Sequence, residues 1–328
     1  MTRLESFPLS VSAGLACLLT VLFAGPAWSQ PLDCGALITQ NTVIQPEDFP
    51  SSPCPEEIFR VGEKTKVDMN GRELGCTSGT GIVLSGAGAR VMNGRVVGTC
   101  TTAVQVTGAT ARVENLTVQA GTDVGVSIEA PGVRVTQSYF TRSDGGVAIA
   151  ISAAATKALV LSNEIELLAS TGTPTGVRDA GSTSSQIRRN SIVNHDSGFA
   201  IEALGASRML MSDNSIMCSL QTGASSPGIS LDSVSSVKVS KNRVLGCFGS
   251  VLVGGDSSDV LLSKNQIGAP RHGIAIGPAT TGSIVSNVFS GTSIPDIGLD
   301  IAGGPACTAG QVKFKKNIFT TSDDPCIE

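Results

Sequence analysis

Three ionisable residues, Arg178, Asp179 and Glu202, are placed so that they could do acid–base chemistry together. Arg178 and Glu202 occupy equivalent positions in neighbouring repeats, and they predict either a surface salt bridge or a general acid or base beside a cation that holds a ligand carboxylate. Asp179 is the one polar residue at an otherwise apolar position, so either the chain turns it outward or it has a buried partner. His195 is a fourth candidate, and a solvent-exposed turn histidine is its alternative interpretation.

A repeat of 22 to 30 residues places these candidates. One motif, apolar-x-x-Asn-x-apolar, recurs with these residues at its Asn position: Asn70, Asn93, Asn115, Gln137, Asn163, Asn190, Asn214, Asn242, Asn265, Asn287 and Asn317. A second motif, apolar-x-apolar, lies between them, and its first position is always aliphatic: Ile82, Val104, Val126, Ile149, Val177, Ile201, Ile229, Val251, Ile274 and Leu299. Such short strands bury a face only by stacking in parallel, with aliphatic columns inside and Asn side chains at the turns. We expect about eleven coils in a rod on the order of 50 Å long.

The paired N-x-I and G-I-x-I pattern resembles the right-handed parallel β-helix, the pectin-lyase-like fold. The resemblance implies a right-handed all-β solenoid, and the cysteine pairs given below would staple its ends. We divide the chain into a signal peptide (1–29), an N-terminal cap (30–61), the parallel β-helix (62–320) and a C-terminal tail (321–328). The segment from Arg271 to Gly277 also resembles polygalacturonases. Arg271 replaces a glycine of that family and Gly249-Ser250-Val251 replaces its acidic pair, so hydrolase activity is not transferred.

The N-terminus and the cysteines predict export. Residues 1–29 contain Arg3, an apolar run and a small-x-small cleavage site, which are features of a secretory signal. Eight cysteines would remain, and an even number favours disulfides in an oxidising compartment. Related positions in neighbouring coils suggest two pairs, and elimination gives the other two: Cys76 with Cys100, Cys218 with Cys247, Cys34 with Cys54, and Cys307 with Cys326. We expect a periplasmic or extracellular protein without a membrane span after signal cleavage.

The charges suggest which partners the protein has. The chain has 23 Lys and Arg against 27 Asp and Glu, a net charge of −4, and the two signs are interspersed, which argues against a nucleic-acid partner. The residues just before the Asn positions of later coils include Arg189, Lys241 and Lys264. A uronate polymer could lie along this stripe. The alternative is a solvated edge in which Arg189 pairs with Asp213.

Two functions remain open. In the first, the exported protein binds or acts on polysaccharide as a lyase, epimerase or hydrolase, with Arg178 or His195 removing the proton next to a uronate carboxylate. No zinc-type or calcium-loop motif is present, so no metal or cofactor is predicted, and calcium is implied only for a lyase. In the second, a non-catalytic periplasmic or cell-surface scaffold binds glycan or protein along its faces. The 4% aromatic content, with Tyr139 the only tyrosine, favours this scaffold.

Overall fold

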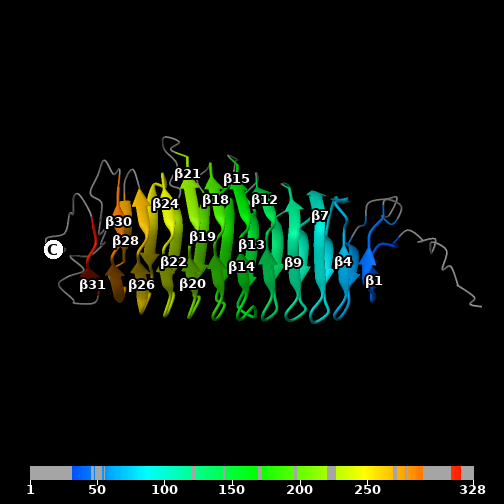
Figure 1. Cartoon of the computed structure of the whole chain (residues 1–328), viewed down its shortest axis with the longest axis horizontal. Coiled ribbons are helices and arrows are strands. Elements are labelled where there is room, and N and C mark those ends of the chain that lie inside the picture. Colours follow the sequence, from blue (N-terminus) through cyan, green and yellow to red (C-terminus); the bar gives the residue numbers. More distant parts are fainter. Residues whose placement is uncertain are drawn as a thin grey trace, which may run out of the picture.

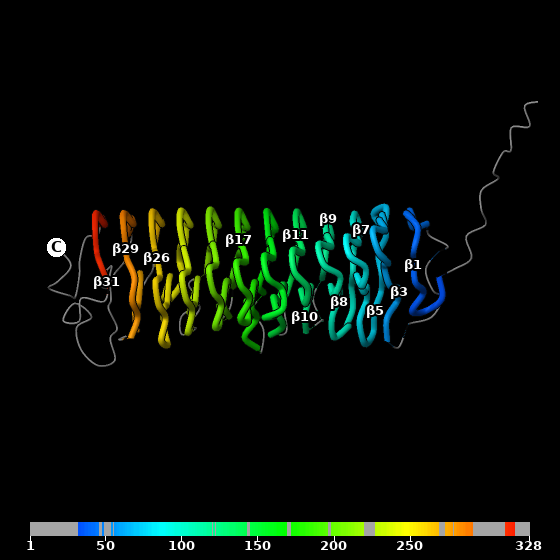
Figure 2. The backbone as a smooth tube through the Cα atoms, turned by 90° about the horizontal axis from the view of Figure 1, so that it is seen from below, coloured from blue at the N-terminus to red at the C-terminus, as the bar shows by residue number. Residues whose placement is uncertain are grey.

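The computed structural model describes residues 32–318 except for 46–47, 49–53, 55, 120, 122, 143–144, 169–171, 196–197, 220–226, 269–271, 278 and 291–311. The strands in these residues form a rod in which successive coils lie side by side along the long axis (Figure 1). The trace in Figure 2 passes from coil to coil in chain order, from β1 at one end to β31 at the other. The expected all-β parallel solenoid is therefore confirmed.

The first face of the rod, face A, is a sheet of eleven parallel strands, one from each coil. Its strands are β1 (Ala36–Ile38), β3 (Glu57–Val61), β6 (Thr80–Leu84), β8 (Thr102–Val106), β10 (Val124–Ile128), β13 (Val147–Ser152), β16 (Thr175–Ala180), β19 (Phe199–Leu204), β22 (Pro227–Asp232), β25 (Gly249–Gly254) and β28 (His272–Ile276). The order in the sheet follows the order in the chain, so each coil stacks directly on the preceding one.

The other two faces share one bent sheet. Strand β7 (Arg90–Gly98) pairs with β4 through its first residues and with β5 through its last, and β9 (Arg112–Val118) likewise turns the corner. Face B contains the first parts of these two strands and β2 (Thr42–Val43), β4 (Lys66–Asp68), β11 (Arg134–Thr136), β14 (Leu159–Leu161), β17 (Gln186–Arg188), β20 (Leu210–Ser212), β23 (Lys238–Ser240), β26 (Val260–Ser263), β29 (Gly282–Val285) and β31 (Val312–Lys315). Face C contains their last parts and β5 (Glu73–Cys76), β12 (Tyr139–Arg142), β15 (Glu164–Leu167), β18 (Ser191–Asn194), β21 (Ser215–Cys218), β24 (Arg243–Leu245), β27 (Gln266–Gly268) and β30 (Val288–Phe289).

Aliphatic columns fill the interior because equivalent strands keep one register. On face A, Ile82 pairs with Val104, and this pairing continues coil by coil to Val251 and Ile274. Every described member of the predicted column is at most 1% exposed. Phe59 extends the column towards the N-terminus, whereas Leu299 lies outside the described residues. The aliphatic column predicted from the second motif is thus confirmed.

The predicted Asn column divides into two parts. In seven coils the Asn side chain lies inside the corner between faces B and C: Asn163, Asn190, Asn214, Asn242, Asn265, Asn287 and Asn317. From Asn190 onward, each Oδ1 accepts bonds of 2.9–3.1 Å from the backbone N–H and the side-chain amide of the preceding member. Each amide also donates to a backbone carbonyl one coil back. We call these seven residues the asparagine ladder.

The four earlier members lie at the same turn, as expected, but they are not part of the ladder: Asn93, Asn115 and Gln137 take the position just before it. Asn70, Asn93, Asn115 and Gln137 have φ values of 50–56° and turn their side chains towards solvent. The left-handed backbone suits Asn, whose short polar side chain tolerates it. Buried Leu116 and Ser138 occupy the interior position that Asn163 takes in the next coil. The motif spacing alone does not distinguish these two neighbouring sites.

Left-handed residues make the sharp turns at two corners of the rod. Between faces B and C, the residue before each later ladder Asn has a φ of 54–58°: Arg189, Asp213, Lys241, Lys264, Ser286 and Lys316. Between faces A and B, a second column has φ values of 52–63°: Lys64, Thr110, Lys157, Ser184, Arg208, Ser236 and Asp259. Both columns turn their side chains outward, so they add charge to the borders of face B.

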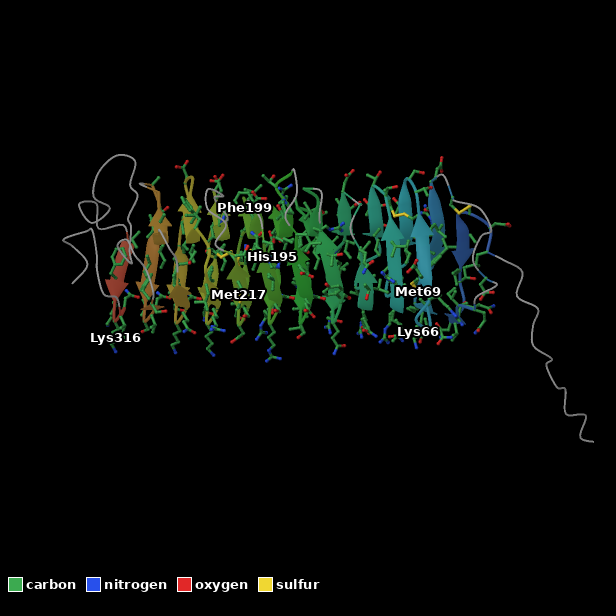
Figure 3. The ribbon with its side chains drawn as sticks, turned by 90° about the horizontal axis from the view of Figure 1, so that it is seen from above. Lys66, Met69, His195, Phe199, Met217 and Lys316 are labelled. Carbon is green, nitrogen blue, oxygen red and sulfur yellow. A yellow bond between two sulfur atoms is a disulfide. The ribbon has the colours of Figure 1, made fainter. Side chains whose placement is uncertain are left out.

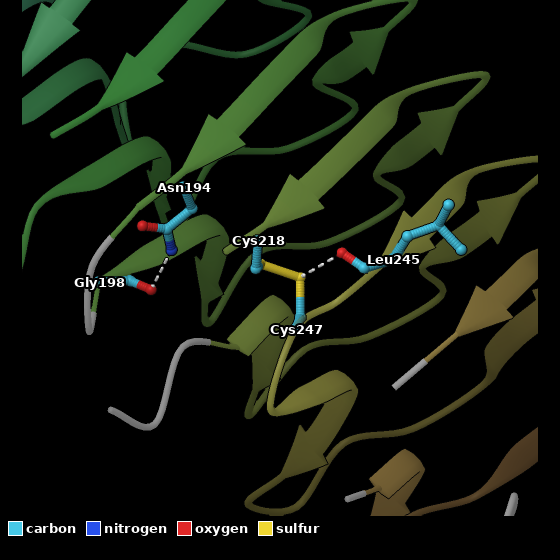
Figure 4. The surroundings of a disulfide bond; sticks show 5 residues. All are labelled: Asn194, Gly198, Cys218, Leu245 and Cys247. Atoms are coloured by element: carbon cyan, nitrogen blue, oxygen red, sulfur yellow. Dashed lines mark hydrogen bonds between the residues drawn. A yellow bond between two sulfur atoms is a disulfide. The ribbon is translucent and has the colours of Figure 1, made fainter. Parts of the chain in front are cut away.

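Three disulfides connect cysteines in the pairs expected from the sequence. Cys34 and Cys54 are joined near the N-terminal end, with Cα atoms 5.4 Å apart. Cys76 pairs with Cys100 and Cys218 with Cys247 across neighbouring coils, at Cα separations of 5.5 and 4.7 Å. Figure 4 shows the last of these beside the Asn194 side chain, which donates a 2.7 Å hydrogen bond to the Gly198 carbonyl.

Some predicted segments cannot be compared with the structure. The pair Cys307 with Cys326, the signal peptide 1–29 and the tail 321–328 lie outside the described residues. Within the segment assigned to the N-terminal cap, 30–61, strands β1, β2 and β3 pair with later strands of the same sheets. Stacking therefore begins before residue 62.

Candidate functional site

Arg178 and Glu202 form an ion pair on face A. They lie on β16 and β19, directly opposite each other, with their side chains pointing outward. The Arg178 Nε atom is 2.5 Å from Glu202 Oε2, and the Arg178 and Glu202 side chains are 39% and 11% exposed. Small residues, Ala150 and Ser230, take the equivalent positions in the coils on either side. The Glu202 carboxylate is therefore largely covered and Arg178 partly exposed, and their two charges largely neutralise each other.

Asp179 lies inside the rod and has no exposed surface. Its strand does not bulge, since it pairs in register with Ile151 and Ala203. Its carboxylate accepts hydrogen bonds from the Ser182 backbone N–H at 2.9 Å, the Ser182 hydroxyl at 2.6 Å and the Ser185 hydroxyl at 2.5 Å. The buried-partner alternative is thus the one found. Asp179 cannot contact a ligand on the outer surface together with Arg178 and Glu202.

His195 follows β18 on face C, whereas Arg178 and Glu202 are on face A. Its Nε2 atom is 3.7 Å from Glu166 Oε1, and the Tyr139 hydroxyl donates a 2.7 Å hydrogen bond to Glu166 Oε2. That hydrogen bond, with a smaller contribution from burial, raises the pKa of Tyr139 to about 12. The described contacts place His195 in a Tyr139–Glu166–His195 group that sequence reasoning missed, because Glu166 carried no motif.

Arg189, Lys241 and Lys264 lie at the corner between faces B and C. All three are exposed and have the left-handed backbone of the turn column. Lys316 occupies the same position near the far end of the rod, and in Figure 3 it lies along the same edge as Lys66. The predicted cationic stripe is therefore present as a row of exposed side chains, interrupted by Asp213 and Ser286.

The stripe is one border of a much larger basic surface. Face B with its two turn columns carries fifteen of the 23 Lys and Arg: Lys64, Lys66, Arg90, Arg112, Arg134, Lys157, Arg188, Arg189, Arg208, Lys238, Lys241, Lys264, Lys313, Lys315 and Lys316. In the described part of the same surface, counting also Glu63 next to Lys64, we find five acidic residues: Glu63, Asp68, Glu114, Asp213 and Asp259. A chain with a net charge of −4 therefore presents a face with ten excess positive charges.

Acidic and basic residues are interspersed along the sequence, as expected, but they are not evenly distributed over the faces of the folded rod. A coil of 22 to 30 residues returns the chain to the same face, so scattered cations are gathered into columns. Clefts and faces with one dominant sign concentrate counter-ions of the opposite sign. Face B is consequently suited to a long anionic ligand that lies parallel to the rod axis.

Neither a metal centre nor a membrane-spanning helix is found where the structure is described. No three His, Cys, Asp or Glu side chains gather there in a way that could hold a metal ion. The same residues include no helix long and apolar enough to cross a membrane.

Comparison with known proteins identifies the fold class. Residues 170–321, somewhat less than half of the chain, match the family model described as right-handed beta helix region. The A-module of mannuronan C-5 epimerase AlgE6 from Azotobacter vinelandii is similar in structure, with a TM-score of 0.54 and 11% identity over 88% of this chain and 89% of that one. A tailspike protein of an Escherichia coli bacteriophage, HK620, in complex with a pentasaccharide, has a TM-score of 0.52 and 10% identity over 86% of this chain and 60% of that one. No curated protein sequence matches the chain.

The fold and the matched segment define the class. The chain has the right-handed parallel β-helix fold. At 10–11% identity the two solved structures show the fold alone.

Proposed function

We propose that the protein binds an acidic polysaccharide laid along face B. The observation that carries the proposal is the gathering of fifteen cations against five described acids on one of three faces of an acidic chain. Arg and Lys side chains recognise carboxylate and sulfate groups through charge-assisted hydrogen bonds. A long straight row of them fits a polymer better than a small ligand.

Two further observations support a glycan over other polyanions. The AlgE6 module acts, by its name, on mannuronan, an acidic polysaccharide, and the tailspike was solved with a pentasaccharide. Three disulfides are typical of proteins that fold in an oxidising compartment, where cell-surface and secreted polysaccharides occur. We propose that residues 1–29 direct the chain to the periplasm or the cell exterior.

Binding to a polyuronate tests the proposal, measured by calorimetry on the mature chain. A polymer that neutralises about five cations should bind about 100-fold more weakly when salt rises from about 50 to about 200 mM, because binding releases condensed counter-ions. A neutral polysaccharide of equal length should not bind. Affinity for the polyuronate that does not change with salt would reject the proposal.

A matched pair of double variants localises the binding. Lys241→Gln with Lys264→Gln removes two cations from the border of face B, and we expect about threefold weaker binding at moderate salt. Arg60→Gln with Arg243→Gln removes the same charge from faces A and C and should leave affinity unchanged. Equal losses in both would mean that net charge, and not face B, governs binding.

A second candidate function is catalysis on the same class of polymer at the face A ion pair. Arg178 lies beside Glu202, so a cation that can hold a uronate carboxylate is next to a general acid or base. Asp179 and His195, which lie in the interior and on face C, are not part of this candidate. Incubation with uronate polymers, with and without calcium, should then give unsaturated or reducing ends or a change in sugar configuration. Arg178→Ala and Glu202→Ala should abolish the product, and activity retained in both would reject the site.

A further inference from the structure

Four cations stack directly on one another at the N-terminal end of face B. Lys66 pairs in register with Arg90, Arg90 with Arg112, and Arg112 with Arg134. We call these four residues the basic ladder. The next two equivalent residues, Leu159 and Gln186, are uncharged, so the ladder is a block of four coils and not a general feature of the face.

The ladder borders a hollow on the surface. The hollow has a volume of about 340 Å³, and four of the eight residues that line it are Lys64, Lys66, Arg90 and Arg112. Its lining residues come from four successive coils, and Gly88 lies at the corner between faces A and B. The hollow therefore extends along the rod beside the cations.

Acidic neighbours compensate only part of this charge. Glu114 is ion-paired with Arg90 and lies 3.8 Å from Arg112, and Asp68 lies 3.6 Å from Lys66. Arg134 is exposed, and its side chain forms no ion pair or hydrogen bond in the described part of the chain. Like charges directly opposite each other on neighbouring strands are destabilising. Two carboxylates cannot fully neutralise four stacked cations, so part of the repulsion between the cations remains. An anionic ligand would remove it.

We propose that the basic ladder is the subsite that selects the polymer, by holding one acidic group per coil on consecutive sugars. This inference rests on the proposed function and specifies its ligand as a polysaccharide charged at every residue. Neighbouring coils are about 4.8 Å apart, close to the length of one sugar in an extended chain. Arg guanidinium groups add direction to the attraction because they hold carboxylates through two parallel hydrogen bonds. A polymer charged on alternate sugars leaves every second cation of the ladder unmatched.

The test compares two polymers and two variants of the mature chain by calorimetry. The polymers are polymannuronate, with a carboxylate on every sugar, and hyaluronate, with one on every second sugar, at equal carboxylate concentration. We expect the wild type to bind polymannuronate about tenfold more tightly, since specificity is the difference between the two affinities. Arg112→Gln with Arg134→Gln should weaken binding of polymannuronate about 30-fold and abolish the preference.

Lys241→Gln with Lys264→Gln is the matched control, because it removes the same charge from another part of the same face. It should weaken both polymers about threefold and keep the preference. Arg134→Gln alone removes no ion pair or side-chain hydrogen bond among the described residues, so a loss of preference in this variant with an unchanged unfolding midpoint excludes misfolding as the cause.

The remaining outcomes of this experiment would overturn either the ladder proposal or the proposed function. Equal affinity of the wild type for both polymers, or equal losses in the two double variants, overturns the ladder proposal and leaves polysaccharide binding on face B intact. Absence of binding to either polymer overturns the proposed function itself. Tighter binding of single-stranded DNA than of polymannuronate overturns both, since face B would then serve a nucleic acid.

Discussion

Replacing Asn214 by alanine removes four buried hydrogen bonds from the centre of the asparagine ladder. Its Oδ1 accepts from the backbone and the side chain of Asn190 at 3.0 Å, and its amide donates to Asn242 and to the Ile187 carbonyl at 2.9 Å. The backbone N–H of Asn190 loses its acceptor inside the protein, which costs about 1–3 kcal/mol, and each of the other three bonds contributes about 1 kcal/mol. We expect the variant to be less stable by about 4–6 kcal/mol.

Urea unfolding followed by far-UV circular dichroism measures this change. Asn115→Ala is the control, because the Asn115 side chain donates one hydrogen bond, to Asn93, at the exposed turn. It should lower stability by only about 1–2 kcal/mol, chiefly because alanine tolerates the left-handed backbone at this position less well than asparagine does. A loss below about 1 kcal/mol in Asn214→Ala, or equal losses in the two variants, would refute the distinction between the buried ladder and the exposed turn residues.

Three further predictions concern the interior, a disulfide and the tyrosine. Asp179→Ala should destabilise the fold by about 4 kcal/mol by removing the acceptor of three buried hydrogen bonds, and should leave polymer affinity of the folded protein unchanged; reduced affinity would contradict its interior position. Replacing Cys218 and Cys247 by alanine opens a loop of 29 residues and should lower stability by about 3.5 kcal/mol in thermal or urea unfolding. The single tyrosine, Tyr139, should give a tyrosinate absorbance with a midpoint near pH 12, and Glu166→Gln should move it towards about 10. Because the folded pKa is raised, this contribution to stability is present below about pH 10 and is lost as pH rises through 12; an unshifted titration in Glu166→Gln would refute the hydrogen bond as its cause.

The fold is largely predictable from the sequence because one physical requirement repeats in every coil. A short strand must bury its aliphatic side, and stacking is the only way to do so, so Ile82, Val104 and their equivalents identify the column without other information. The sequence predicts less well which Asn residues are buried in the ladder and which are exposed at the turn. An exposed left-handed site and a buried hydrogen-bonding site are one residue apart, and Asn suits both.

The candidate site was predictable only where it depends on register. The pairing of Arg178 with Glu202 follows from alignment of the coils, and the structure places them together. The partners of Asp179 are serines three and six residues later, which strand periodicity does not reveal. The charge of face B was missed for a different reason. Charges were compared along the chain, whereas the coil brings together residues that are a full turn apart.

The change of corner chemistry at Ser138 limits how this rod can grow or be rebuilt. Its backbone N–H bonds to Asn163, and its hydroxyl accepts the backbone N–H of Leu116, so one small residue joins an amide-lined segment to an apolar one. A coil copied from the amide-lined segment finds matching partners anywhere beyond this junction. If the same coil were inserted before this junction, its Asn side chain would lie against Leu116, which offers no side-chain hydrogen-bond partner. A coil that is duplicated, by evolution or by design, can therefore be inserted only within the segment from which it was copied.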